Sequence, residues 1–325
     1  MKDRSSPSLL SALPVLLLIL LLAFPGLAVQ GASQGLLLWF QVVLPTLAPF
    51  MICTRAISAM GGTALLARPA YPLFHALFGL SMQGSCVLLC GLLCGYPLGA
   101  RLCADFCGRG ELSREEAEYL LSICNHPSPM FLLGFAGSRL AVHPLVLPAC
   151  VYLPLLPLSR LSGHRFFREK ALPQKTMRSL PPADALSLEE MILSTAEAMV
   201  LIGGCMMLFS ILALWIQELP FLPDYGKALL AGAAEITTGI DQLCTVFPED
   251  IRLVPVAAAV SFGGISGIFQ TRGALFLPSG KQEASLSAVQ KNAGLSIRHY
   301  VLWKIVHGCL SCILALAVLA VSGRR

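Results

Sequence analysis

The chain is poor in charged residues. Aspartate, glutamate, lysine and arginine make up 13% of its 325 residues, hydrophobic residues make up 56%, and the mean hydropathy is +0.74. In a typical soluble domain roughly a quarter of the residues are charged. Too few charged groups are present here to cover a water-facing surface, so the composition excludes an ordinary soluble protein and predicts an integral membrane protein.

The sequence also lacks the patterns of a metal centre or a nucleic-acid site. No histidine pair completes a zinc pattern around Cys309 and Cys312, and Cys86, Cys90 and Cys94 follow a helical spacing within an apolar run. We therefore expect the twelve cysteines to be small buried apolar residues in a reducing or lipid-buried setting. No cofactor and no metal is expected, while a coupling proton or sodium ion stays open. The basic residues gather in a stretch whose prolines argue against a folded domain, so no nucleic-acid partner is expected.

Long apolar runs are the most abundant feature of the chain. Six are long enough for a hydrocarbon core of about 30 Å: residues 9–29, 36–60, 140–158, 191–216, 254–277 and 300–321. Three more are shorter and interrupted: residues 82–107, 119–137 and 228–247. The first run follows Lys2 and Arg4, and no convincing A-x-A cleavage site comes after it. We expect residues 1–30 to form an uncleaved anchor helix with its N-terminus inside, with a secretory signal peptide as the alternative.

The remaining runs predict two membrane repeats, residues 31–159 and 188–325, with one order of elements. Each repeat has a long span, an interrupted hairpin-like run, a helix broken at its middle and a final span. If the interrupted runs are re-entrant hairpins, each repeat crosses the membrane three times and the second is upside down relative to the first. The expected fold is an all-α polytopic membrane protein with seven full spans, two inverted repeats, re-entrant hairpins and broken helices.

A basic linker, residues 160–187, separates the two repeats. Between residues 160 and 178 it contains a single acidic residue, Glu169, and six basic residues: Arg160, Arg165, Arg168, Lys170, Lys175 and Arg178. Positive charge between membrane segments marks the cytoplasmic side. The linker is therefore predicted to be cytoplasmic, and the same topology places the loop at residues 220–225 outside.

Prolines interrupt the first predicted broken helix near the bilayer midplane. The stretch SREE at residues 113–116 is a capping-box pattern, and a helix that begins there reaches Asn125 after about 17 Å. Pro127 and Pro129 stop this helix. Ser128 and Pro129 then fit the N-cap and first position of a new half-helix, whose positive end faces inward.

Glycines interrupt the second predicted broken helix and the first predicted hairpin. A helix that begins near Glu249 reaches residues 261–267, SFGGISG, where Gly263 and Gly264 permit unwinding at a similar depth. In the first hairpin, Gly95 and Pro97 allow a turn that presents Tyr96 to a cavity. Backbone groups freed within hydrocarbon cost several kcal/mol each unless they are satisfied. Two breaks at matching depth therefore predict a binding site, with ordinary kinks or small-residue helix packing as the alternative.

The second hairpin contains an ionisable residue at predicted membrane depth, Glu235. Such residues usually face a cavity or an ion path, although a carboxylate near the interface is the alternative. Thr237 and Thr238 either line the pocket with their hydroxyl groups or donate hydrogen bonds to their own helix. Arg101 is either a cation that binds the substrate or an anchor at the cytoplasmic interface. The expected substrate-binding residues are Tyr96, Asn125, Ser128, Glu235, Thr237, Thr238, Ser261, Ser266 and Gln270. The expected structural breaks are Gly95, Pro97, Pro127, Pro129, Gly263 and Gly264.

Five stretches of the chain resemble the YlbJ-type sporulation integral membrane proteins of the nucleoside-recognition, or Gate, domain group. They are GLLLWFQVVLPTLAPFMI (35–52), CGYPLGARL (94–102), LSREEAEYLLSICNHPSPMF (112–131), EITTGI (235–240) and SFGGISGIFQ (261–270). The resemblance implies a fold similar to concentrative nucleoside transporters. It also implies transport of dipicolinic acid from the mother cell toward the forespore, across the mother-cell-derived outer forespore membrane.

Other functions remain open at this point. A nucleoside-type transporter and a non-transporting sporulation assembly factor both fit the same motifs. The stretch GISG at residues 264–267, with His299 or His307 as a base, matches the G-x-S-G pattern of rhomboid-like intramembrane serine proteases. We expect no enzymatic activity and no catalytic residue, because helix unwinding already explains these glycines. The expected partners are the lipid bilayer and a small-molecule substrate, and a homo-oligomer stays open.

Overall fold

The computed structural model describes residues 9–60, 62–163, 187–276 and 294–322. This part of the chain is helical and contains no strand, which confirms the all-α class. Four segments are long and apolar enough to cross a membrane: Pro25–Ile57, Leu188–Gln217, Leu253–Leu275 and Ile297–Val321. The bent pair Tyr71–Phe78 and Met82–Cys94, with 98° between its helices, would make a fifth. The described residues thus provide four or five candidate spans, compared with the seven that we predict from the sequence.

Two predicted spans are divided in the structure. The run at residues 9–29 breaks at Phe24, so α1 (Leu9–Ala23) is only 15 residues long and α2 (Pro25–Leu38) continues into the next span. At 1.5 Å per residue α1 is shorter than the hydrocarbon core. The run at residues 140–158 divides at Pro154 into α9 (Val146–Tyr152) and α10 (Leu155–Ser162). Proline lacks the N–H that would continue each helix, which explains both divisions.

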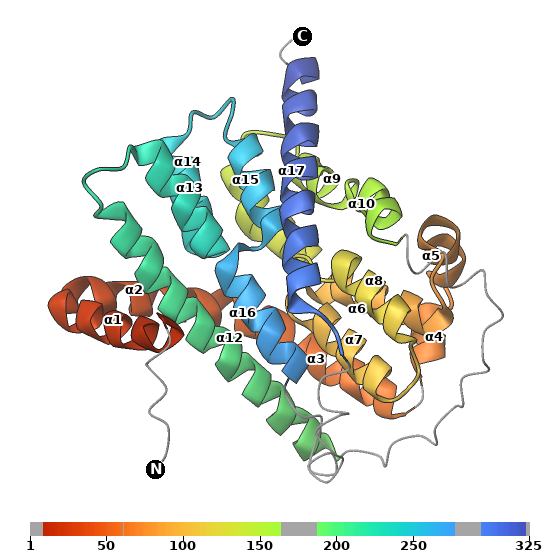
Figure 1. Cartoon of the computed structure of the whole chain (residues 1–325). Coiled ribbons are helices and arrows are strands. Elements are labelled where there is room, and N and C mark those ends of the chain that lie inside the picture. Colours follow the sequence, from red (N-terminus) through yellow and green to blue (C-terminus); the bar gives the residue numbers. More distant parts are fainter. Residues whose placement is uncertain (1–8, 61, 164–186, 277–293, 323–325) are drawn as a thin grey trace, which may run out of the picture.

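Figure 1 shows how the helices of the two halves are arranged, and their order along the chain is as follows. In the first half α2 is followed by a π-helical segment, η1 (Trp39–Val43), and these helices: α3 (Leu44–Ala59), α4 (Thr63–Ala67), α5 (Tyr71–Phe78), α6 (Met82–Cys94), α7 (Leu98–Gly108) and α8 (Arg114–Ile123). The π-helical η2 (Phe131–Ala136) and the short 3₁₀ turn η3 (Gly137–Arg139) precede α9 and α10. The second half contains α12 (Leu188–Gln217), α13 (Asp224–Ala234), α14 (Ile236–Val246), α15 (Leu253–Phe262), α16 (Gly264–Phe276) and α17 (Ile297–Ser322). Most of the basic linker lies outside the described residues.

The N-terminal signals of the broken helices differ in detail from the prediction. Ser113 caps α8 as expected, since its Oγ accepts a hydrogen bond from the Glu116 backbone N–H at 3.1 Å. The Glu116 carboxylate does not complete the capping box, because it accepts a hydrogen bond from the Ser81 backbone N–H at 2.7 Å instead. In the second half, α15 begins at Leu253 rather than near Glu249. The glutamate side chain therefore joins α8 to the start of α6.

Glycines allow α2 to pack directly on α12. Gly31 and Gly35 are four residues apart, and a Cβ at either position would come within 2.9 Å of α12 backbone atoms. Beside them, the Trp39 indole N–H donates a hydrogen bond to the Met199 carbonyl at 2.9 Å. Small residues at this spacing let two helices approach closely within a membrane. This contact joins the first half of the chain to the longest helix of the second.

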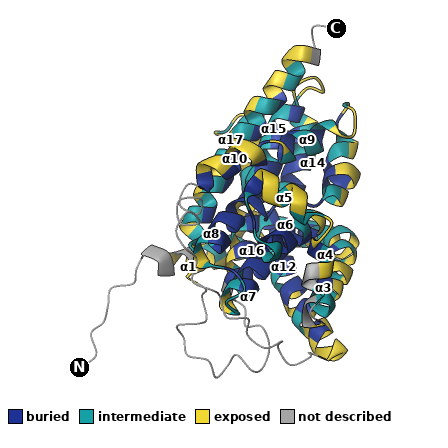
Figure 2. Ribbon diagram, turned by 90° about the vertical axis from the view of Figure 1, so that its right-hand side faces the viewer, coloured by how far each residue is buried: buried dark blue, intermediate teal, exposed yellow. Residues whose placement is uncertain are grey.

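Burial is arranged as expected for a membrane protein. Figure 2 shows buried residues through the middle of the molecule and exposed ones along its edges and on the outer helices. The outer faces carry large apolar side chains such as Leu22, Val200 and Ile313, which are more than half exposed. Lipid tails would cover such faces, since hydrocarbon is as apolar as these side chains. The interior, in contrast, contains several buried polar residues that define the candidate site.

Candidate substrate cavity and buried cation

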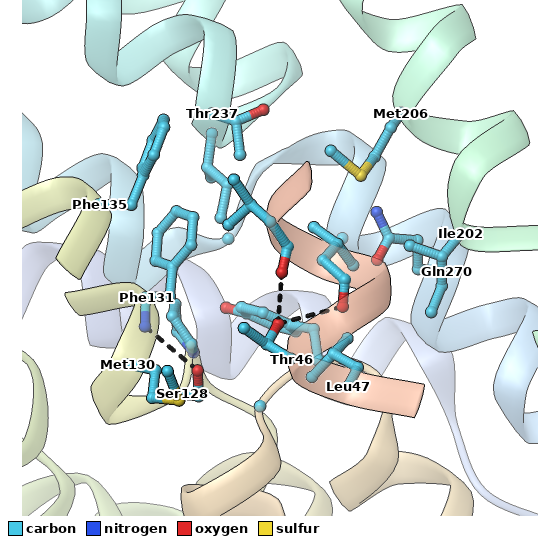
Figure 3. A pocket seen from close by; sticks show the side chains of 18 of the residues that line it. Thr46, Leu47, Ser128, Met130, Phe131, Phe135, Ile202, Met206, Thr237 and Gln270 are labelled. Atoms are coloured by element: carbon cyan, nitrogen blue, oxygen red, sulfur yellow. Dashed lines mark hydrogen bonds between the residues drawn. The ribbon is translucent and has the colours of Figure 1, made fainter. Parts of the chain in front are cut away.

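Interrupted segments from both halves line one cavity of about 290 Å³. Its walls come from η1 and α3, the turn between α6 and α7, the break after α8, α12, the start of α14, and α16. Figure 3 shows Phe131 and Phe135 on one side, with Ile202, Met206 and Gln270 on the other. The cavity is therefore mostly apolar with a few polar groups, as small-molecule sites usually are.

The structure brings many of the predicted site residues to this cavity. Those that line it are Tyr96, Ser128, Glu235, Thr237 and Gln270, together with the structural breaks Gly95, Pro127 and Gly263. The predicted residues that do not line it are Asn125, Thr238, Ser261 and Ser266, and the breaks Pro97, Pro129 and Gly264. The four polar residues of the second group are buried although they do not line the cavity.

The turn between α6 and α7 lies against the break in the first half. Gly95 ends α6 with φ +85°, a left-handed conformation that favours glycine. The next peptide bond, Tyr96–Pro97, is cis. A Cβ at Gly95 would lie 2.8 Å from the Ser128 backbone nitrogen. The absence of a side chain at Gly95 thus lets the turn touch the unwound segment after α8.

The break after α8 has the predicted cap. The chain is not helical from Asn125 to Ser128, and the Ser128 Oγ accepts a hydrogen bond from the Phe131 backbone N–H at 3.3 Å. This bond is drawn in Figure 3. The Tyr152 hydroxyl donates to the Pro127 carbonyl at 2.8 Å and satisfies one of the freed acceptors. Ser128 therefore marks the positive end of a helical segment at the wall of the cavity.

Glu235 separates α13 from α14 and caps the second of these helices. Its backbone is extended, and its Oε2 accepts hydrogen bonds from the Thr238 N–H at 2.8 Å and from the Thr237 hydroxyl. A carboxylate at a helix N-terminus is favoured by the free N–H groups and the helix dipole. The Thr238 hydroxyl pairs with Ser210 of α12 at 3.1 Å, which explains why Thr238 does not reach the cavity.

The break between α15 and α16 meets the hairpin turn of the first half. Gly263 and Gly264 have φ values of +86° and +71°. A Cβ at Gly263 would overlap the Tyr96 hydroxyl, so only glycine leaves room for that ring. Further along α16, the Gln270 side-chain amide donates a hydrogen bond to the Ser266 Oγ at 3.0 Å. The two halves are thus in direct contact at the wall of the cavity.

Among the residues that line the cavity, Glu235 is the charged one. Arg101, the predicted cation for the substrate, lies elsewhere. Its guanidinium pairs with Asp105 at 3.1 Å and contacts the Ala274 carbonyl at 3.4 Å. No cluster of three or more potential metal ligands occurs within the described ranges. A positive charge for the site must therefore be sought behind the cavity wall.

A buried lysine, Lys304, lies behind Tyr96, and the sequence reasoning missed it. The Lys304 Nζ lies 5.1 Å from the centre of the Tyr96 ring, 3.3 Å from His126 Nδ1 and 3.4 Å from the Asn125 carbonyl oxygen. Lys304, Asn125 and His126 are fully buried. The available signal was an ionisable residue in the apolar run 300–321, which usually marks a functional position in a membrane span.

A second buried histidine extends this polar cluster. His307 lies one turn after Lys304, and its ring packs edge-on against His126 with 4.7 Å between centroids. Its Nε2 is 2.8 Å from the Val151 carbonyl oxygen and its Nδ1 is 3.2 Å from the Ser261 carbonyl oxygen. Four buried atoms in and around the cluster have no hydrogen-bond partner: Tyr96 OH, Asn125 Oδ1, His126 Nε2 and Ser261 Oγ.

The residues of the protease alternative are arranged differently from a serine–histidine pair. Both ring nitrogens of His307 face carbonyl oxygens, and the His299 Nε2 accepts a hydrogen bond from the Trp303 indole at 2.9 Å. Ser266 accepts from Gln270 rather than donating to a histidine. Among the described residues, neither His299 nor His307 is hydrogen-bonded to Ser266, whereas an activated serine needs an adjacent base within hydrogen-bond reach.

The sequence reasoning also missed the contribution of η1 and α3. Gln41 and Thr46 line the cavity, and the Thr46 hydroxyl donates to the Val42 and Val43 carbonyls at 2.6 and 3.0 Å. The prediction relied on prolines and glycines as markers of helix breaks, whereas a π-helical segment has no such marker. Two polar residues within an apolar run were the available signal.

Comparison with known proteins supports the resemblance to one kind of sporulation protein. No protein-family model matches the chain, and no solved structure matches it. The chain is 25% identical to the "Sporulation integral membrane protein YlbJ" of Bacillus subtilis (strain 168), and the alignment covers 74% of this chain and 68% of that protein. The chain is therefore similar to a YlbJ-type sporulation integral membrane protein, as the resemblance of its motif stretches predicts.

Proposed function

We propose that this protein is a membrane transporter for a small polar or anionic metabolite. The observation that carries the proposal is the cavity at which interrupted helices from both halves meet. Discontinuous helices at the interface of two repeats form the substrate sites of many secondary transporters. An inverted arrangement of the two halves and a likeness to concentrative nucleoside transporters belong to this proposal. No enzymatic step is proposed.

Dipicolinic acid is the substrate that the resemblance favours. The relative is by its printed name a sporulation protein, and transport toward the forespore would place this protein in the outer forespore membrane. The cavity offers a planar aromatic acid the rings of Phe131 and Phe135, stacked with 5.1 Å between centroids. The helix start at Ser128 offers N–H groups and a positive dipole end for a carboxylate.

Glu235 imposes a condition on such a substrate. An ionised carboxylate in the wall of the cavity would repel a dianion, and this repulsion is strong where water is scarce. A proton on Glu235 removes the repulsion. Movement of an anionic substrate is therefore proposed to accompany protonation of Glu235, which makes a proton the coupling ion.

Uptake by purified full-length protein in liposomes tests the proposal. Labelled dipicolinate and labelled nucleosides would be compared in liposomes with protein and in protein-free liposomes of the same lipids. We expect saturable uptake of dipicolinate above the protein-free level. Uptake of nucleosides alone would favour the nucleoside-type transporter, and no uptake of either class, with bound substrate also absent, would favour the non-transporting assembly factor.

A further inference from the structure

The ends of two broken helices converge on the same lysine-containing cluster. The Asn125 carbonyl, just after α8, lies 3.4 Å from the Lys304 ammonium. The Ser261 carbonyl, in the last turn of α15, lies 3.2 Å from Nδ1 of His307 on the next turn of α17. The last carbonyls of a helix have no partner within the helix and carry the negative end of its dipole. A carbonyl of the unwound segment after α8 and a carbonyl of the last turn of α15 therefore face one pair of side chains on α17.

The ammonium in this cluster has neutral partners. Its neighbours are a carbonyl oxygen, an imidazole nitrogen and the face of the Tyr96 ring, and the salt bridges of the described residues do not include Lys304. Carbonyl oxygens and aromatic faces both attract small monovalent cations. In transporters, unwound carbonyls and the C-terminal ends of half-helices are the groups that coordinate a coupling sodium ion.

We propose that the meeting point of α8, α15 and α17 is a monovalent-cation site that the protein fills with its own Lys304 ammonium. The ammonium occupies the place that a small cation would take against the Asn125 carbonyl, the His126 ring and the Tyr96 face, so no sodium or potassium ion is needed there. The site is separate from the cavity, because Tyr96 lies between Lys304 and the cavity wall. The site is suited to a small cation of ammonium size, and the Lys304 side chain provides that cation.

Removal of the side chain should convert this site into one for an external cation. Thermal unfolding of the purified full-length protein would be measured in choline, sodium and methylammonium chloride at constant ionic strength. Lys304→Ala should unfold below the wild type in choline, and methylammonium at tenfold excess over its Kd should raise its Tm by about 3 °C. The wild type should unfold at the same temperature in all three salts. Lys227→Ala, which removes a lysine paired with Asp224 on α13, is the matched control and should show no methylammonium response.

Two results would overturn the proposal. A sodium-specific rise in the Tm of the wild type would show that an external cation is bound in addition to Lys304. A folded Lys304→Ala protein that responds to neither sodium nor methylammonium would show that no cation site exists. If Lys304→Ala does not fold, Lys304→Gln decides: it should unfold below the wild type without any cation response, and an unchanged Tm would exclude a need for the charge. These measurements record stability rather than transport, so a failure of the proposed transport function would not affect them.

Discussion

Glu235 illustrates how one side chain can serve the helix and the cavity together. It is 2% exposed, it lines the cavity, and its Oε2 holds the first turn of α14 through Thr237 and Thr238. A glutamine at this position keeps an oxygen acceptor for the cap but cannot ionise or exchange a proton. The structural and the proton-carrying roles of the residue can therefore be separated by one substitution.

We expect Glu235→Gln to abolish or uncouple substrate transport while the protein stays folded and inserted. The physical reason is that the amide still caps α14 but no longer binds and releases a proton. Uptake into liposomes as a function of pH would measure the effect, with unfolding temperature as the check on the fold. Glu249→Gln, an exposed glutamate on the loop before α15, is the control. Normal uptake with unchanged pH dependence would remove Glu235 from the mechanism.

Ser128 is the second residue with a specific prediction. Its hydroxyl lies at the wall of the cavity and at the start of the half-helix, whereas Asn125 donates to Thr271 and Tyr300 at 2.8 and 3.0 Å behind the wall. We expect Ser128→Ala to weaken substrate binding by about 1 to 2 kcal/mol, since a buried hydrogen bond to a charged group is lost. This corresponds to an increase in Kd of about 5- to 30-fold.

Asn125→Ala should instead lower the unfolding temperature more than it weakens binding, because its hydrogen bonds join the break to α16 and α17. Equilibrium binding of labelled substrate to both variants would measure the difference. Ser138→Ala, at an exposed serine just after η2, is the control for Ser128. The two-break site would be contradicted if Ser128→Ala bound substrate like the wild type while Ser261→Ala and Ser266→Ala did not.

Among the elements, the α2–α12 pair depends on close packing of glycines. A Cβ at Gly35 would lie 2.8 Å from the Met206 carbonyl oxygen and 2.9 Å from the Ser210 hydroxyl. The same helix offers Gly26, at which an added Cβ would have no neighbour within 4 Å. The two positions lie in one helix and differ in tertiary packing, which allows the contribution of this contact to be measured.

Gly35→Ala is expected to destabilise the protein by about 1 to 3 kcal/mol, because the added methyl forces α2 away from α12. Gly26→Ala should leave stability unchanged or raise it slightly, since alanine favours a helix more than glycine does. Unfolding of both variants in the same detergent would be compared. Equal stability of the two variants would show that the glycine contact does not hold these helices together.

At the scale of the whole molecule, the distribution of charged residues predicts which loops lie on each side of the membrane. The linker at residues 160–178 is expected inside and the loop at residues 220–225 outside. Single cysteines placed at Lys170 and at the exposed Phe221, in a background without other reactive cysteines, should react with an impermeant thiol reagent from opposite sides of the membrane. Reaction of both from one side would contradict this topology.

The local parts of this molecule could be predicted from sequence because proline and glycine act locally. Pro127 and Pro129 stop α8, and Gly263 ends α15, for reasons that depend only on the backbone at those residues. The Lys304 cluster could not be predicted, because its partners lie more than 170 positions away in the sequence. The described residues give four or five candidate spans rather than seven for a related reason: total hydropathy does not show whether an apolar run continues through Pro25 or Pro154 as one helix.

The contact between Tyr96 and Gly263 also restricts how the two halves of the chain can move relative to each other. The hairpin turn of the first half rests on the glycine break of the second, and no side chain intervenes at Gly263. A displacement of one segment must therefore either displace the other or separate the pair. If the two halves move during transport, this contact would couple their displacements at the wall of the cavity, so that the cavity would open toward one side of the membrane at a time.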